Sequence, residues 1–78
     1  MRRREAWNAV VGRMEGLLRS YPASEDVPMA LARLAYARHQ LDQGERAAEV
    51  AQRLQTDYPG SRADQWLGRK APQLISPQ

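Results

Sequence analysis

Apolar side chains recur along this chain at steps of three and four residues, the spacing that places them on one face of an α-helix. The first such stripe contains Trp7, Val10, Val11, Met14, Leu17, Leu18 and Tyr21. Three more helices are expected, from Ser24 or Asp26 to about 42, from about 45 to 57, and from Ser61 to a point before Pro72. The sequence shows no run with the two-residue period of a β-strand. The pattern therefore predicts an all-α fold of about four helices.

Two copies of one short signature separate these helices. The pattern L-x3-Y-P-x-S begins at Leu17 and again at Leu54, an offset of 37 residues. Proline ends a helix because it lacks a backbone donor, and a serine hydroxyl can then accept an N–H at the start of the next helix. We expect both tyrosines to pack beneath their prolines and both serines, Ser24 and Ser61, to cap helices. The repetition indicates an internal repeat.

The middle of the chain carries a longer pattern. It reads L-x2-L-A-x2-R from Leu31, followed by A-x3-A-x2-L-x4-P from Ala47. These spacings resemble a tetratricopeptide repeat, a helix-turn-helix unit of about 34 residues. The resemblance covers roughly residues 6–70. It implies antiparallel helical hairpins of the tetratricopeptide α-solenoid type, with small side chains such as Ala35 and Ala47 where paired helices cross.

The chain departs from the repeat family at several positions. Leu31, Arg38 and Ala51 stand where the family has aromatic residues, and the turn glycine comes late, at Gly44. The L-x3-Y-P-x-S signature is similar to the repeats of bacterial envelope proteins, namely the outer-membrane assembly lipoproteins and the coordinator of the Tol-Pal system. The substitutions at Leu31, Arg38 and Ala51 and the late glycine bear on the expected packing between successive repeats.

The net charge of +3 comes entirely from Arg2, Arg3 and Arg4, since the rest of the chain carries nine basic and nine acidic side chains. A nucleic-acid surface needs basic side chains clustered on one face. The interspersed charges argue against such a surface and leave only the N-terminal arginines for an anionic polymer. Without an apolar anchor these arginines are predicted to be disordered. The expected organisation is a basic tail over 1–4, a single helical domain over 5–71 and a C-terminal tail over 72–78.

The sequence does not predict a catalytic or a metal-binding site. The chain has no cysteine and one histidine, His39, so it lacks the usual zinc ligands. Its glycines do not form the G-x-G-x-x-G or G-K-S/T motifs that bind phosphates, and its serines come with no recognisable oxyanion loop. We therefore predict a protein that is not an enzyme and that has neither cofactor nor bound metal.

One face of the second predicted helix is more polar and aromatic than packing requires. Its Tyr36 lies off the face that carries the leucines of this helix. In tetratricopeptide proteins the corresponding face lines a concave groove, so the resemblance implies a partner-binding groove formed by Met29, Arg33, Tyr36, His39 and Gln40. The leading hypothesis is a protein–protein interaction adaptor that binds a protein or peptide segment. An ordinary solvated face is the alternative interpretation.

A single complete repeat leaves both ends of a solenoid uncovered, and about three repeats are normally needed for stability. Apolar surface is expected at one end from Trp7 and Val11 and at the other from Trp66 and Leu67. We therefore predict a homodimer that pairs through these residues. A self-assembling structural module is the second functional hypothesis, and an anionic-polymer binder that uses the basic tail is the third.

Two glycines, Gly12 and Gly16, fall inside the first predicted helix. Each costs about 1 kcal/mol relative to alanine in a helix interior. We therefore expect another backbone to approach the first helix closely at these positions.

Residues 6–12 are too few and too polar for the apolar core of a signal peptide. A membrane-spanning helix would need about 18 apolar residues in succession, which the sequence does not contain. As written, the chain is expected in the cytoplasm, with the periplasm as the alternative if it is a fragment that lacks its leader.

Overall fold

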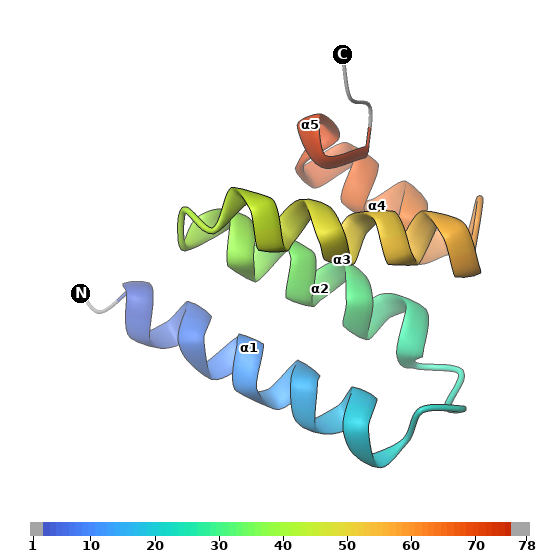
Figure 1. The fold of residues 1–78 in the computed structure, drawn as a ribbon, viewed down its shortest axis with the longest axis horizontal. Coiled ribbons are helices and arrows are strands. Elements are labelled where there is room, and N and C mark those ends of the chain that lie inside the picture. Colours follow the sequence, from blue (N-terminus) through green and yellow to red (C-terminus); the bar gives the residue numbers. More distant parts are fainter. Residues whose placement is uncertain (1–2, 76–78) are drawn as a thin grey trace.

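The computed structural model describes residues 3–75. These residues form α1 (Arg3–Ser20), α2 (Val27–Gln40), α3 (Gly44–Asp57), α4 (Arg62–Lys70) and α5 (Pro72–Ile75). Strands are absent from the described part of the chain. Successive long helices run in opposite directions along the molecule (Figure 1). The prediction of an all-α fold built from helical hairpins is confirmed.

Helix α2 is the centre of the fold. It packs against α1, α3 and α4, whereas α5 contacts α3 and α4. In Figure 1, α3 lies in front of α2, with α1 along the lower edge and α5 near the top. The molecule measures 35 × 33 × 18 Å along its principal axes, so it is about two helices thick. Side chains on α2 therefore have neighbours from each of the three other long helices.

Small side chains let α2 approach its neighbours closely. Ala32, Ala35, Ala37, Ala47 and Ala51 have no exposed surface. The predicted burial of Ala35 and Ala47 is thus observed, and it permits α2 and α3 to pack at short distance. Larger side chains, Leu31, Leu54 and Leu67, fill the space around these alanines, each at most 1 % exposed. Each buried leucine contributes about 2 kcal/mol, and together they join α2, α3 and α4 in one apolar cluster.

The two copies of the Y-P-x-S signature adopt different structures. In the second copy, Ser61 Oγ accepts the backbone N–H of Asp64 at 3.1 Å and caps α4, as predicted. In the first copy, Ser24 Oγ accepts the N–H of Asp26 at 3.0 Å, before α2 begins. Asp26, the other predicted start, is the N-cap residue of α2. The copies differ because Gly60 has a φ of 69°, which the alanine at the matching position does not adopt.

The turn between α2 and α3 ends α2 with paired backbone hydrogen bonds. The N–H of Gln43 donates to the Arg38 carbonyl at 2.9 Å, and that of Asp42 donates to the His39 carbonyl at 3.1 Å. This is the Schellman motif, in which one residue takes a left-handed conformation. Asp42 takes it, with a φ of 62°. Gly44, where the sequence placed the turn glycine, is instead the first residue of α3.

Helical structure extends into both segments that were predicted to be tails. Helix α1 begins at Arg3, so Arg3 and Arg4 are helical, because arginine favours helix and no proline or glycine separates them from the apolar stripe. Helix α5 forms within the predicted C-terminal tail. Its Leu74 and Ile75 pack against the core, and Gln55 Nε2 donates to the Ile75 carbonyl at 3.2 Å. The outermost residues of both predicted tails lie outside the described part.

Two expectations about close packing are wrong. Apart from the adjoining residues and backbone of α1 itself, no described atom lies within 4 Å of a Cβ placed at Gly12 or Gly16, so no second backbone among the described residues approaches α1 there. Tyr21 is 65 % exposed and does not pack beneath its proline. Tyr58, at the equivalent position of the second junction, is partly buried against the core.

A largely buried arginine connects α1, α2 and the turn that follows α2. Arg38 Nη2 donates to Glu15 Oε2 of α1 at 2.5 Å, and Arg38 Nη1 donates to Gln43 Oε1 at 2.7 Å. The Arg38 side chain is 12 % exposed. Arg38 shares a helical face with Leu31 and Leu34, but the identity of its partner depends on how α1 docks on α2.

Candidate functional site

Three aromatic rings from three helices meet on one face of the molecule. Tyr36 of α2 lies between Trp7 of α1 and Trp66 of α4, with ring centroids 5.5 Å and 5.7 Å apart. The interplanar angles are 83° and 76°, an edge-to-face arrangement that aromatic quadrupoles favour. All three side chains are only partly buried. The cluster therefore combines fixed geometry with apolar surface that remains open to solvent.

The cluster lines a surface depression of about 320 Å³. Val10 adds an aliphatic side to this depression, and Arg33 and Lys70 add two cationic groups. Both cationic residues are exposed. An apolar floor with a few charged groups at its edge is the usual composition of a binding pocket in proteins.

Two further depressions continue this surface along α2. One, of about 270 Å³, lies between α1 and α2 and shares Arg33 with the aromatic depression. The other, of about 220 Å³, lies between the N-terminal ends of α2 and α4 and shares Met29 with its neighbour. We call the three together the α2 groove. Its central residues are Trp7, Val10, Met14, Leu17, Asp26, Met29, Arg33, Tyr36, Trp66 and Lys70.

The structure places three of the five predicted groove residues in the α2 groove. Met29, Arg33 and Tyr36 line it, as their shared helical face suggested. His39 instead faces α5, with its Nε2 3.0 Å from Gln73 Nε2. Gln40 is exposed at the end of α2 and lines none of the three depressions.

The residues predicted to form a dimer interface divide into two groups. Val11 is 9 % exposed and Leu67 is fully buried, so both belong to the core of the chain. Trp7 and Trp66 were expected at opposite ends of the molecule, but they contact the same tyrosine. The reason is that α1 and α4 both pack on α2, which brings two distant segments to one face.

Sequence reasoning missed the cationic residue Lys70 and the joint role of the two tryptophans in this groove. The sequence contained a signal for part of this missed site. The offset of 37 residues that relates the two Y-P-x-S signatures also relates Arg33 to Lys70 and Met29 to Trp66. Residues at equivalent positions of successive repeats line the same surface. The predicted internal repeat would therefore extend the predicted site from α2 to α4.

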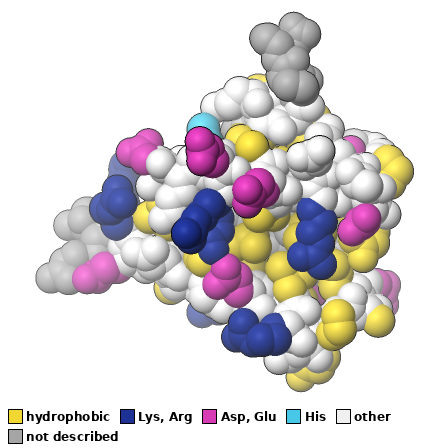
Figure 2. All heavy atoms as spheres, viewed as in Figure 1, with side chains coloured by type: hydrophobic (Ala, Val, Ile, Leu, Met, Phe, Trp, Pro, Cys, Tyr) yellow, Lys and Arg dark blue, Asp and Glu magenta, His cyan; other side chains and the backbone are white. Residues whose placement is uncertain are grey.

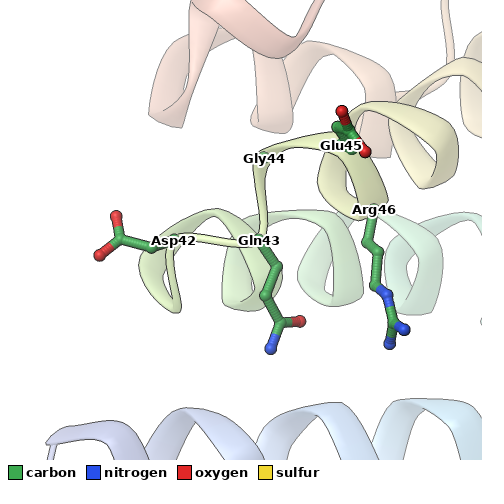
Figure 3. Close-up of a pocket in the computed structure, with 5 residues that line it drawn as sticks. All are labelled: Asp42, Gln43, Gly44, Glu45 and Arg46. Atoms are coloured by element: carbon green, nitrogen blue, oxygen red, sulfur yellow. The ribbon is translucent and has the colours of Figure 1, made fainter.

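The turn between α2 and α3 forms a further hollow, of about 450 Å³, lined by residues 42–46. Figure 3 shows that its side chains point in three directions: Asp42 points away from the fold, Gln43 and Arg46 both extend towards α1, and Glu45 lies on the opposite side of the turn. Groups that diverge cannot contact one small ligand together. This hollow is a consequence of the tight turn, and we do not regard it as a binding site.

The face that carries α3 is chemically mixed. Figure 2 shows apolar side chains there interrupted by basic and acidic ones. A shallow depression of about 400 Å³ on the surface is lined by Leu18 and Leu34 together with Glu15, Arg19 and Arg53. Glu15 is already paired with Arg38. This face lacks the aromatic cluster that distinguishes the α2 groove.

No cluster of three or more metal-ligating side chains occurs among residues 3–75. In the same range, no helix is long and apolar enough to cross a membrane. Comparisons with known protein families, with curated proteins and with solved structures found no match. The assignment of function therefore depends on the groove itself.

Proposed function

We propose that the chain is a non-enzymatic interaction module that binds a segment of another protein in the α2 groove. The observation that carries this proposal is the aromatic cluster of Trp7, Tyr36 and Trp66, which brings rings from three helices together and is partly open to solvent. Tryptophan, tyrosine and arginine are the residue types that contribute most to protein–protein binding energy. A preformed groove also loses little entropy when it binds.

We further propose that the fold is of the tetratricopeptide type and that the chain acts as an adaptor. In this interpretation α2 and α3 form one complete repeat, α1 is the second helix of the repeat before it, and α4 is the first helix of the next. The contacts of α2 with α1, α3 and α4 and the buried Ala35 and Ala47 support it. The α2 groove then corresponds to the concave side of the solenoid.

Selection of a random-peptide display library on the full chain tests the proposed function. We expect peptides to be recovered whose affinity falls at least about fivefold in Tyr36→Ala. Tyr21→Ala is the matched control, because it removes the same side chain from an exposed position outside the groove. Unchanged affinity in Tyr36→Ala, or equal losses in both variants, contradicts the proposal.

Tyr36 also packs against two rings, so its replacement lowers stability as well. Circular dichroism melts of each variant therefore accompany the binding measurement. Val10→Arg is a second variant, because it adds a long side chain at a partly exposed groove position without removing an aromatic contact. We expect it to block the same peptides while the chain stays helical. Binding that survives Val10→Arg in a folded chain would place the peptide elsewhere.

A further inference from the structure

We propose that the segment bound in the α2 groove is acidic, with an apolar side chain packed on the aromatic cluster and a neighbouring Asp or Glu paired with Arg33 and Lys70. This inference rests on the proposed function and adds the chemical class of the partner. It is carried by the placement, directly beside the three rings, of two cations that form no ion pair within residues 3–75.

The helical register fixes both cations next to the cluster. Arg33 precedes Tyr36 by three residues on α2, and Lys70 follows Trp66 by four residues on α4. Residues three or four positions apart are neighbours on a helix surface. Each cation therefore lies one turn from a ring of the cluster, and both line the same depression. A bound apolar side chain would have a positive group on each of two sides.

The described part of the chain does not neutralise these cations. Among the described residues, no carboxylate lines the aromatic depression, and neither Arg33 nor Lys70 forms an ion pair. The carboxylate of the groove nearest in sequence to Arg33 is Asp26, the N-cap residue of α2, seven residues earlier or about 10 Å along the helix axis. An acidic partner supplies the missing charge. Complementary charge on the partner also raises the association rate, whereas repulsion between like charges disfavours basic partners.

The same observations favour a short acidic peptide over a nucleic acid. Nucleic-acid binding depends on neutralising several phosphates at once, whereas this depression offers two cations. Further along the groove, beyond Arg33, Asp26 and Glu25 outnumber the single lining cation among the described residues, Arg62, and would repel a continuous polyanion. In addition, Tyr36 contacts the other two rings edge to face, so the cluster does not present parallel platforms for successive bases. The charge pattern limits the acidic stretch to the aromatic end of the groove.

The composition of the peptides selected on the full chain tests this inference. We expect enrichment of sequences in which an aromatic or large aliphatic residue is flanked by Asp or Glu. The double variant Arg33→Glu and Lys70→Glu should weaken these peptides by about tenfold or more. The matched control, Arg19→Glu with Arg46→Glu, changes the net charge equally at exposed positions outside the groove. It should retain nearly full affinity.

Each of the other possible outcomes contradicts the acidic partner, the proposed function or both. Selected peptides that are neutral or basic, yet lose binding in Val10→Arg, would disprove the acidic partner and leave the proposed function intact. Recovery of no peptide at all would contradict both. Oligothymidylate is the probe for the other class of polymer. Two results together would show that the groove is a nucleic-acid site and that the inference is wrong. Oligothymidylate would bind the full chain with an affinity that falls steeply with salt, and the double variant would weaken its binding more than it weakens the binding of the acidic peptides.

Discussion

At the scale of single residues, Arg38 shows how one polar side chain can connect separate helices. Its guanidinium donates to Glu15 and Gln43 from a position that is 12 % exposed. We expect Arg38→Ala to lower the free energy of unfolding by about 2 kcal/mol, because it removes charged hydrogen bonds at a site largely shielded from water. Urea unfolding followed by circular dichroism measures this loss.

A second arginine of the chain serves as the control. Arg53 pairs with Asp57 at 3.9 Å, but the two side chains are 59 % and 53 % exposed. Exposed ion pairs contribute about 0–1 kcal/mol, so Arg53→Ala should cost clearly less than Arg38→Ala. Equal losses in the two variants would show that the Arg38 contacts do not contribute as described.

The left-handed turn residue leads to a second prediction. Asp42 has a φ of 62°, a conformation that glycine adopts without the steric cost that other residues bear. We expect Asp42→Gly to raise the free energy of unfolding by about 1 kcal/mol. Gly60→Ala should have the opposite effect, because Gly60 has a φ of 69°. Thermal melts of both variants check the signs, and a destabilised Asp42→Gly would contradict the turn geometry.

At the scale of helices, most of what the sequence predicts is local. Proline, glycine and capping residues lie next to the ends they define, so the boundaries of α2, α3 and α4 were predicted to within a few residues. The two Y-P-x-S copies were expected to act alike and do not. Ser61 caps α4, but Ser24 does not cap α2. The reason is that the left-handed conformation of Gly60 shortens the connection between α3 and α4, whereas the connection between α1 and α2 has no residue in this conformation.

The first helix offers a prediction that reverses an expectation from the sequence. A Cβ added at Gly12 or Gly16 meets no described atom within 4 Å apart from the adjoining residues and backbone of α1 itself. Alanine at either position should therefore raise helix stability without a clash, by about 1 kcal/mol each. Chemical unfolding of the single and double variants measures the gain. If either variant is destabilised, another molecule packs on this face of α1, and the self-assembly hypothesis gains support.

At the scale of the whole molecule, the candidate site depends on how the helices pack. Met29, Arg33 and Tyr36 share one face of α2, so their periodicity was enough to place them together. Trp7 and Trp66 are 59 residues apart, and only the packing of α1 and α4 on α2 brings them to Tyr36. His39 and Gln40 lie near the end of the same helix, where the groove has already ended.

The predicted homodimer stays a prediction, but its surface is now defined. Because Val11 and Leu67 are buried, Trp7 and Trp66 are the predicted interface residues that remain partly open, and both lie in the α2 groove. Self-association should therefore compete with peptide binding. We expect sedimentation equilibrium to show a mass that rises with protein concentration and falls when a selected peptide is added. A monomer mass at all concentrations, with a melting temperature that does not depend on concentration, would reject the dimer.

The central claim is that the face formed by α1, α2 and α4 binds a protein segment. The most direct measurement is a nuclear magnetic resonance titration of the 15N-labelled full chain with a selected peptide. The chain has two tryptophans, so the indole N–H signals of Trp7 and Trp66 report on the cluster separately. The account predicts that both indoles and the amides of Arg33 and Lys70 shift, while exposed α3 residues such as Gln52 do not. Shifts confined to α3, with unchanged indole signals, would contradict it.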